Sequence, residues 1–166
     1  IGPLHGGWNL AKRLLQHERK AMSKFGEFSL PTHFHLLPLV SQYLPDPSGQ
    51  SESALMARAV ATAMNEHSYN LTVQRMAEEA RAGQDVSGLM AIMKLVHTEQ
   101  ERDKFEVLLD VMGYHALGWD QGTFTTQEQA ITRGWLNSFA LTISGGSSEV
   151  QLNVIAKRVL GLPDVK

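Results

Sequence analysis

The chain has 166 residues, enough for one domain with a single sizeable core, and its formal net charge is -2. Because basic and acidic residues are interspersed, no basic patch indicates a nucleic-acid partner, and no apolar run approaches the roughly 18–20 residues of a membrane span. The absence of cysteine excludes disulfide scaffolds and thiolate zinc sites. The first residues, IGPLHGGW, lack the features of a signal peptide, so we expect a cytoplasmic protein without a membrane partner.

Apolar residues recur with a helical period along nearly the whole chain, and no useful strand-like alternation appears. The segment SLPTHFHLLPLVSQYLPDPSG (29–49) contains four prolines and is expected to form a loop, or a loop with one short element. The predicted helices cover residues 8–25, 51–82, 86–112, 125–141 and 148–160. The fold predicted from this pattern is all-α, an antiparallel bundle of four or five helices.

Hydroxyl side chains mark the predicted helix starts. Ser51 is placed to cap the second predicted helix. Thr125 and Glu128 have the spacing of a capping box, in which each side chain bonds the other residue's backbone N–H. Ser148 and Gln151 have the same spacing at the start of the last helix. These residues predict three capped helices.

A carboxylate lies in an unexpected place on the first predicted helix. The apolar arc of this helix is formed by Trp8, Ala11, Leu14, Leu15, Met22 and Phe25. Glu18 falls at the angular centre of that arc, where a carboxylate is costly unless it is paired or faces a cavity. Two interpretations are open: Glu18 pairs with an arginine from a neighbouring helix, or the arc lines a pocket in which Glu18 is a desolvated base with a raised pKa.

The stretch TISGGSSEVQ (142–151) joins the last two predicted helices. Gly145 and Gly146 permit positive φ angles and a close approach to the backbone, and the helix that follows points unpaired N–H groups outward. The stretch could therefore cradle an anion or phosphate. Spacing alone favours an ordinary capped turn.

Metal ligation is not indicated by the histidines or carboxylates. The sequence has neither the Glu-x-x-His pairs of di-iron bundles nor a His-Glu-x-x-His motif. His33 and His35 lie in the proline-rich segment with no carboxylate close by. We therefore expect no metal site.

The two ends of the chain, GGWNLAKRLLQHER and TISGGSSEVQLNVIAKRVLGLP, resemble the C-terminal helical domain of the acyl-CoA dehydrogenases. The resemblance implies one helical domain, residues 1–166, of a larger flavoenzyme whose N-terminal helical and central β-domains lie outside this chain. It also implies FAD as cofactor, an acyl-CoA substrate, and an electron-transfer flavoprotein or a similar electron acceptor. A homodimer or homotetramer is implied as the assembly.

The reaction implied by the resemblance is α,β-dehydrogenation of an acyl-CoA thioester. In this family a carboxylate removes the α-proton while the β-hydrogen passes as hydride to N5 of FAD. The base precedes the Gly-Thr/Ser-Ser-Glu motif, where this chain has Gly145, or belongs to the Glu-Arg pair of the first helix, where it has Glu18. The resemblance thus points to Glu18 as the α-proton base. The other residues that it assigns are Ser147, Ser148, Glu149, Gln151 and Gly113 for the cofactor, and Arg19, Gly145 and Gly146 for the substrate.

Two family motifs are altered in this chain. The Arg-x-x-Phe-Gly stretch that follows the first helix in many members is replaced by FGEFSLPTHFHLLPL, and Gln-x-x-Gly-Gly is replaced by DVMGY (110–114). An alternative to the enzyme domain is therefore a non-catalytic oligomerisation module or the inactive half of a heteromer. A relative with flavin oxidase or monooxygenase chemistry is a third interpretation. For the 166-residue chain by itself we expect little FAD binding and no activity.

Overall fold

The computed structural model describes the chain except for residues 1–3, 5, 25–34, 46–48, 120–121 and 164–166. It separates into two units, residues 1–33 and 34–166. The first unit contains α1 (Gly7–Lys24). The second contains α2 (Leu36–Tyr43), α3 (Gln50–Arg81), α4 (Ser87–Met112), a 3₁₀ turn η2 (Gly113–Leu117), α5 (Thr126–Leu141), α6 (Ser148–Val154) and a π-helical turn η3 (Ile155–Val159).

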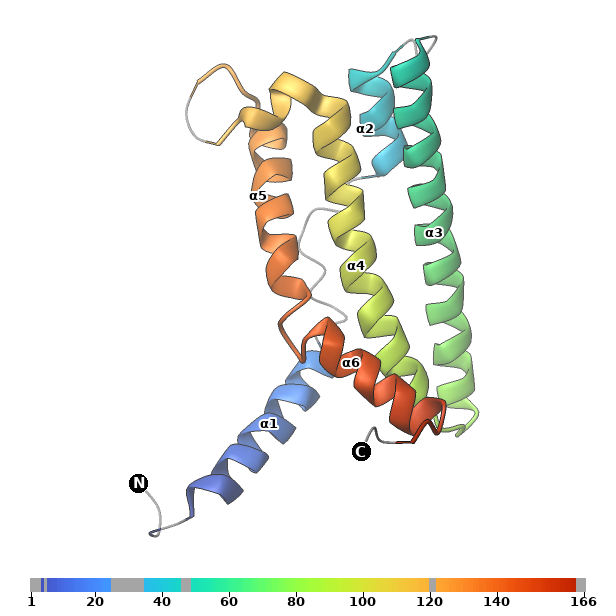
Figure 1. Cartoon of the computed structure of the whole chain (residues 1–166), viewed down its shortest axis with the longest axis vertical. Coiled ribbons are helices and arrows are strands. Elements are labelled where there is room, and N and C mark those ends of the chain that lie inside the picture. Colours follow the sequence, from blue (N-terminus) through green and yellow to red (C-terminus); the bar gives the residue numbers. More distant parts are fainter. Residues whose placement is uncertain (1–3, 5, 25–34, 46–48, 120–121, 164–166) are drawn as a thin grey trace. The chain divides into compact units, whose positions relative to one another are not determined.

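The described residues contain helices and no strand, which confirms the predicted all-α class. The helices α3, α4 and α5 run antiparallel, joined by a short connection after α3 and by η2 and a loop after α4 (Figure 1). The predicted bounds of the long helices are confirmed to within two residues. No helix of the described part is long and apolar enough to cross a membrane.

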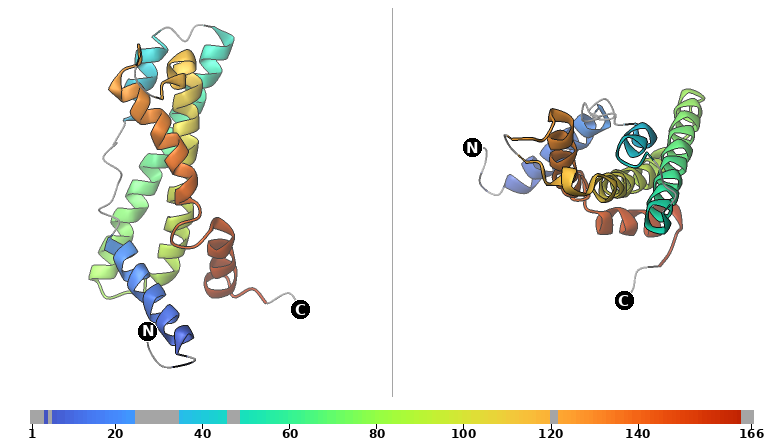
Figure 2. Two further views of the ribbon diagram at one scale, coloured as in Figure 1. Left: turned by 90° about the vertical axis from the view of Figure 1, so that its left-hand side faces the viewer. Right: turned by 90° about the horizontal axis from the view of Figure 1, so that it is seen from above.

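The helix α4 is central to the second unit. It contacts α2, α3, α5 and α6, whereas α3 and α5 do not contact each other (Figure 2). Its buried side chains therefore point in several directions rather than along one stripe, as expected for a helix surrounded by others. The main core cluster consists of Leu36, Leu39, Val40, Ala59, Phe105, Val107, Leu108, Val111, Met112 and Ile131.

The short helix α2 is the element hidden in the proline-rich segment. Pro38 is tolerated because it occupies the first turn, where backbone N–H groups have no intrahelical partner. Leu36, Leu39 and Val40 lie on one helical face and are almost completely buried against α3 and α4. Of the two structures expected for this segment, the loop with one short element is therefore the one found.

Polar side chains also tie the helices together. Lys104 of α4 is nearly buried, and its Nζ lies 2.9 Å from Oε1 of Glu66 on α3. A second carboxylate, that of Glu101, lies 3.8 Å away. A buried ammonium requires such partners, because an unpaired charge in the interior is costly. The pair fixes the contact between α3 and α4 near the middle of α3.

The capping box at the start of α5 is confirmed and is part of a larger cluster. The Thr125 hydroxyl accepts from the Glu128 backbone N–H, and the Glu128 carboxylate accepts from the Thr125 backbone N–H at 2.6 Å. The same carboxylate also accepts from the Tyr43 hydroxyl at 3.2 Å and lies 2.6 Å from Nδ1 of His115. Glu128 is itself buried. One carboxylate therefore joins α2, η2 and α5.

The cap predicted at Ser51 is wrong. The helix α3 begins one residue earlier, at Gln50, and its N-cap is Gly49, which supplies no side-chain hydrogen bond. The Ser51 hydroxyl lies within the first turn and donates to Oε2 of Glu52 at 2.9 Å. The acidic Glu52 in this turn still favours the helix start electrostatically.

A glycine inside α5 gives a sharp test of the α4–α5 contact. In an ordinary helix interior, replacing glycine by alanine stabilises by about 1 kcal/mol. At Gly134, however, a Cβ would lie 2.5 Å from Cζ and 2.6 Å from Cε1 of the buried Phe105. We predict that Gly134→Ala lowers the free energy of unfolding by about 1–3 kcal/mol, because overpacking outweighs the helix propensity. Urea denaturation measures the change.

The control for this prediction is the double variant Gly134→Ala/Phe105→Leu. If the clash is the cause, the smaller side chain makes room, and the alanine costs less in the Phe105→Leu background than in the wild type. A stability increase in the single variant, or strictly additive effects, would show that α4 and α5 do not pack at this point.

The Glu128 cluster predicts a pH dependence of stability. The backbone N–H of Thr125 is the main cause that lowers the pKa of Glu128 below its ordinary value; burial opposes it, and Thr125, Tyr43 and His115 add to the lowering. A lowered folded-state pKa means that the ionised carboxylate stabilises the protein above the ordinary pKa of about 4.3. This stability is lost as the pH falls through the folded-state value. Glu128→Gln keeps a residue suited to the capping box but removes the charge.

We therefore expect Glu128→Gln to be less stable than wild type at pH 7, with the gap shrinking towards pH 3. Denaturant midpoints of both proteins at each pH measure it. Glu78→Gln, which alters an exposed carboxylate of α3, is the control and should show little gap at either pH. A gap that is constant with pH would mean that the Glu128 charge contributes nothing.

Candidate functional site

The connection between α5 and α6 is the turn formed by residues 142–147. It begins where the Thr142 hydroxyl donates to the Phe139 carbonyl at 2.8 Å, and it ends at Ser147, the N-cap of α6. Gly145 and Gly146 have φ angles of 67° and 102°. Side chains are strained at such angles, so the two glycines are required by the backbone. The positive φ angles suggested by the sequence are present.

Hydrogen bonds within the segment define the path of the turn. The Ser147 hydroxyl accepts from the Val150 backbone N–H, which makes Ser147 and not Ser148 the N-cap. The Gln151 side chain donates to the Gly145 carbonyl at 3.2 Å instead of closing a capping box with Ser148. The predicted Ser148–Gln151 box is therefore wrong. The helix starts where it was predicted, but its cap lies one residue earlier.

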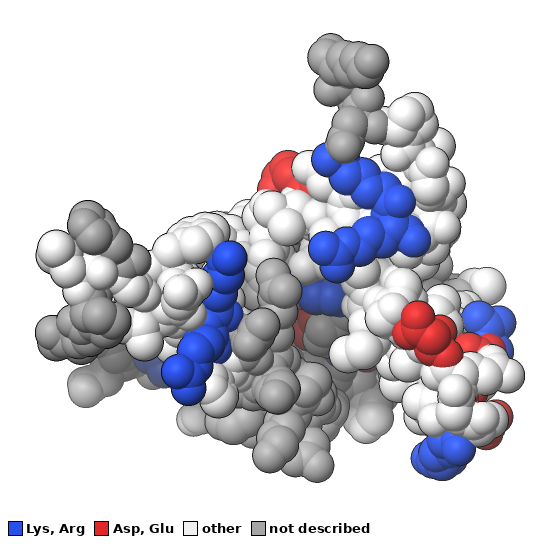
Figure 3. Space-filling view, turned by 90° about the horizontal axis from the view of Figure 1, so that it is seen from below, with Lys and Arg blue, Asp and Glu red and all other residues white. Residues whose placement is uncertain are grey.

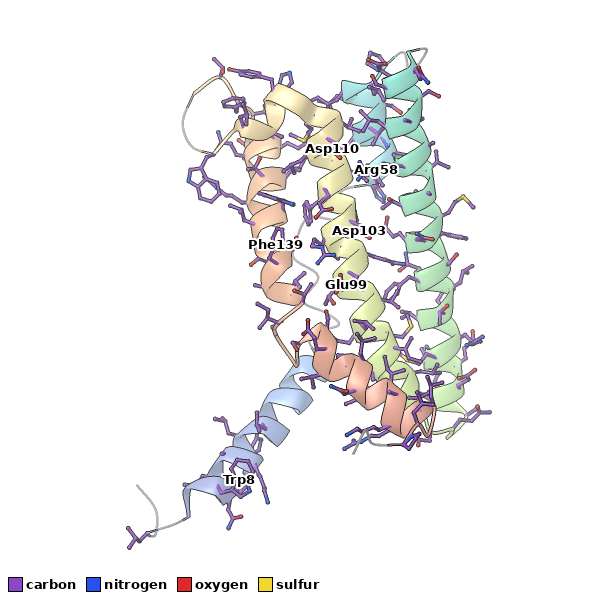
Figure 4. All side chains as sticks on the ribbon, in the orientation of Figure 1. Trp8, Arg58, Glu99, Asp103, Asp110 and Phe139 are labelled. Atoms are coloured by element: carbon purple, nitrogen blue, oxygen red, sulfur yellow. The ribbon has the colours of Figure 1, made fainter. Side chains whose placement is uncertain are left out.

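Two side chains of α4 form hydrogen bonds with the turn and with the start of α6. Nζ of Lys94 donates to the Gly146 carbonyl at 2.7 Å, and the Ser148 hydroxyl donates to Oε1 of Glu99 at 2.7 Å. The Glu99 carboxylate is itself paired with Arg102 at 2.9 Å. Figure 4 shows Glu99 on α4. The turn is thus attached to the central helix by one contact at its second glycine and one at the start of α6.

The charges at the turn favour a capped turn over a phosphate cradle. Burial lowers the pKa of Lys94, while the carboxylates of Glu99 and Glu149 act in the opposite direction. A hydrogen bond from Ser147 is the main cause that lowers the pKa of Glu149, and Lys94 adds to it. The start of α6 therefore already has two carboxylates, which repel a phosphate.

Sequence reasoning missed Lys94 and Glu99. A signal for Lys94 was present, because it interrupts the apolar run LMAIMKLV in α4, as Glu18 interrupts the arc of the first helix. Its partner could not be found in the same way. Gly146 lies 52 positions further along the chain, and no local spacing rule connects residues on different helices.

Glu18 and Arg19 lie in the helix α1, but their side chains are outside the described part of the structure. Because α1 belongs to the first unit and the turn to the second, the structure describes these two parts of the predicted site separately. Among the described members of the apolar arc, Trp8, Leu14 and Leu15 are exposed. Phe25 lies outside the described residues, as does the side chain of Met22.

Gly113, the remaining predicted cofactor residue, ends α4 with a φ of 52°, and a Cβ there would meet no atom within 4 Å. Asp110, in the last turn of α4, forms an ion pair with Arg58 of α3, and Figure 4 shows the two side chains approaching each other. Arg58 thus partly neutralises the charge of Asp110, the acidic residue of the altered DVMGY stretch. Arg58 was not recognised from the sequence, since it lies 52 positions away.

The described residues contain no group of three or more histidine, aspartate or glutamate side chains placed to hold a metal ion. His35 is described and exposed, whereas His33 lies outside the described residues.

The chain was compared with known proteins. Residues 45–160 match the family described as acyl-CoA dehydrogenase, C-terminal domain. The chain is 30% identical to the acyl-CoA dehydrogenase FadE34 of Mycobacterium tuberculosis over 98% of its own length and 21% of that protein. It is 30% identical to the acyl-CoA dehydrogenase IpdE1 of Mycolicibacterium smegmatis, covering 98% of this chain and 38% of the relative. The M. tuberculosis IpdE1 is 35% identical over 58% of this chain.

The chain therefore spans about a fifth of the length of FadE34 and about two fifths of that of the M. smegmatis IpdE1. No solved structure matches it significantly. The family match covers most of the second unit, including α3, α4, α5, α6 and the turn. On this evidence the chain belongs to the acyl-CoA dehydrogenase family, with residues 45–160 corresponding to the family's C-terminal domain.

Proposed function

We propose that residues 1–166 form the C-terminal helical domain of a larger FAD-dependent enzyme that catalyses α,β-dehydrogenation of an acyl-CoA thioester. The observation that carries this proposal is the similarity to acyl-CoA dehydrogenases over 98% of the chain. The turn at 142–147 adds support, because its two glycines have positive φ angles and carry no side chains where the resemblance places the flavin and the thioester. The proposal extends to an electron-transfer flavoprotein or a similar acceptor as partner.

We propose that FAD packs against backbone, rather than against side-chain donors, at this turn. Gly146 has little room for a side chain, because a Cβ there would lie 2.9 Å from Nε2 of Gln151. The hydroxyls of Ser147 and Ser148 and the Gln151 amide are used within the chain, so they would support FAD mainly by fixing the backbone beside it. Glu149 and Gly113 complete the proposed cofactor residues. When bound, FAD would supply the two-electron acceptor of the reaction.

Glu18 is the residue that we propose as the α-proton base. A thioester α-proton is only weakly acidic, so its removal requires a carboxylate with a raised pKa held close to the α-carbon. The alternative base position is Gly145, whose φ of 67° would strain any other side chain. Arg19 and the bare backbone of Gly145 and Gly146 are proposed to contact the substrate. Of the two positions at which the family has its base, this chain has a carboxylate only at Glu18.

A second candidate function is a non-catalytic helical module, or the inactive half of a heteromer. The Asp110–Arg58 ion pair favours it, because it occupies the stretch where many family members have Gln-x-x-Gly-Gly. The experiment below separates this candidate from the enzyme, since an inactive module neither contributes a base nor responds to its removal.

The test of the proposed base is Glu18→Gln in the flavin-loaded enzyme that contains this chain. Glutamine keeps the shape and removes the basicity, so we expect FAD content and acyl-CoA binding to persist. The rate of flavin bleaching by acyl-CoA should fall by about 10²–10⁴-fold, the usual contribution of a general base. Stopped-flow absorbance with a panel of acyl-CoAs measures the rate and identifies the substrate.

The matched control is His17→Gln, which changes the adjacent exposed side chain of α1. It should leave bleaching within a few-fold of wild type. If Glu18→Gln is equally harmless, Glu18 is an ion-pair residue and the assignment of the base is wrong. If no acyl-CoA bleaches the wild-type flavin, the second candidate is favoured.

Self-association with a second copy of the chain is also proposed. Apolar side chains are exposed along one face of α5 and the turn, at Leu136, Phe139 and Ile143, and along one face of α3, at Val60, Met64 and Leu71. Figure 3 shows the face seen from below, where separate groups of Lys and Arg side chains interrupt residues of other types. Contiguous exposed apolar stripes are typical of protein interfaces. The proposed assembly is a homodimer or homotetramer.

Light scattering of the 18.4 kDa chain should therefore give a dimeric or tetrameric mass at micromolar concentrations. Phe139→Glu and Met64→Glu each place a charge in one stripe, and we expect at least one of them to shift the mass towards the monomer. A monomeric mass at every concentration in the wild type, or an unchanged oligomer in both variants, would contradict this interface.

A further inference from the structure

The turn at 142–147 cannot fix its own position. Gly145 and Gly146 contribute no side chains, and glycine has more backbone freedom to lose on folding than any other residue. The π-helical turn that follows α6 packs near the beginning of α4, where Val159 would meet a Cβ on Gly88 at 3.2 Å. This contact anchors the far end of α6 but leaves the glycines to be held by other groups.

Those groups are Lys94 and Glu99, on the most heavily packed helix of the unit. The ammonium of Lys94 is partly desolvated, as the lowered pKa of this group indicates, and it donates to a backbone carbonyl at 2.7 Å. Glu99 accepts from Ser148 at 2.7 Å and is oriented by Arg102. A charge-assisted hydrogen bond is roughly twice as strong as a neutral one. Two such bonds, at Gly146 and at Ser148, fix the C-terminal end of the turn to α4.

The Lys94 contact also determines which way one peptide group faces. In a trans peptide the C=O and the following N–H point in opposite directions. With the Gly146 carbonyl bound to Lys94, the Ser147 N–H points away from that ammonium. The Gly145 carbonyl is bound by Gln151, so the Gly146 N–H likewise points away from Gln151. Within the described residues, neither N–H donates a hydrogen bond.

We infer that Lys94 and Glu99 are positioning residues, which hold the 142–147 turn against α4 in the one orientation that presents its backbone to flavin and substrate. This inference rests on the proposed function for its catalytic consequence, but its structural part stands on the contacts themselves. A displacement of about 1 Å at a substrate-positioning element can cost about 10²-fold in rate. Loss of either contact is therefore expected to affect chemistry more than stability.

The experiment compares Lys94→Met, Lys94→Arg and Ser148→Ala with Lys104→Met. Methionine keeps the length of Lys94 without its donor, arginine retains a cationic donor, and Ser148→Ala removes the Glu99 contact from the other side. Lys104 is the matched control, because it also extends from α4 but pairs with Glu66 of α3 and not with the turn.

The first measurement is amide hydrogen exchange of the 166-residue chain. The reporters are the N–H groups of Ser148 and Gln151, which bond to the carbonyls of Thr142 and Ser147. Lys94→Met and Ser148→Ala should speed their exchange at least about tenfold relative to the α3–α4 core, with partial rescue in Lys94→Arg. Lys104→Met should lower the denaturation midpoint without this local change. Unchanged exchange in both turn variants overturns the inference, whatever the enzyme does.

The second measurement uses the flavin-loaded enzyme that contains the chain. In Lys94→Met the visible absorption band of bound FAD should shift and its bleaching by acyl-CoA should slow at least about tenfold, while Lys104→Met leaves both unchanged. Faster exchange with an unaltered flavin spectrum and rate would overturn the positioning role and leave the proposed function intact. A wild-type enzyme that no acyl-CoA reduces would instead overturn the proposed function and the catalytic part of this inference together.

Discussion

The packing of α4 in the middle of the second unit is the constraint on which the rest of that unit depends. Because other helices contact it on several sides, its side chains face different neighbours: Phe105 meets α5, Lys104 pairs with α3, and Lys94 and Glu99 hold the turn. The turn therefore takes its position from a helix that is itself fixed from several directions. This explains how six residues with two glycines can form a defined surface.

The long helices α3 and α4 could be predicted from the sequence because each runs for many residues without proline and is closed by a glycine, Gly83 or Gly113. The short helix α2 was harder to predict, because it has only eight residues and one of them is a proline. Its burial depends on contacts with α3 and α4, which its own sequence does not show. The helix caps could be predicted only in part. Thr125 and Glu128 satisfy each other locally, whereas Ser51 and Ser148 lie in the first turns of helices whose N-caps are Gly49 and Ser147.

The candidate site could likewise be predicted only in part. Its backbone was predictable, since consecutive glycines before a hydroxyl-rich helix start indicate positive φ angles without reference to the rest of the fold. Its supports were not, because the pairs Lys94–Gly146 and Arg58–Asp110 each join residues 52 positions apart. A charged residue in an apolar run indicates that a partner is needed but not which one. Only the three-dimensional structure identifies the partner.

The polar side chains of the turn have a consequence for the chemistry that the domain can perform. The hydroxyls of Ser147 and Ser148 and the Gln151 amide are all engaged within the chain, and none is left as an obvious nucleophile or acid. What the turn offers to a ligand is mainly backbone, which orients and excludes water but does not transfer a proton. In the proposed reaction the base therefore comes from another segment, and the residue that we propose for it, on the resemblance to the family, is Glu18 of α1.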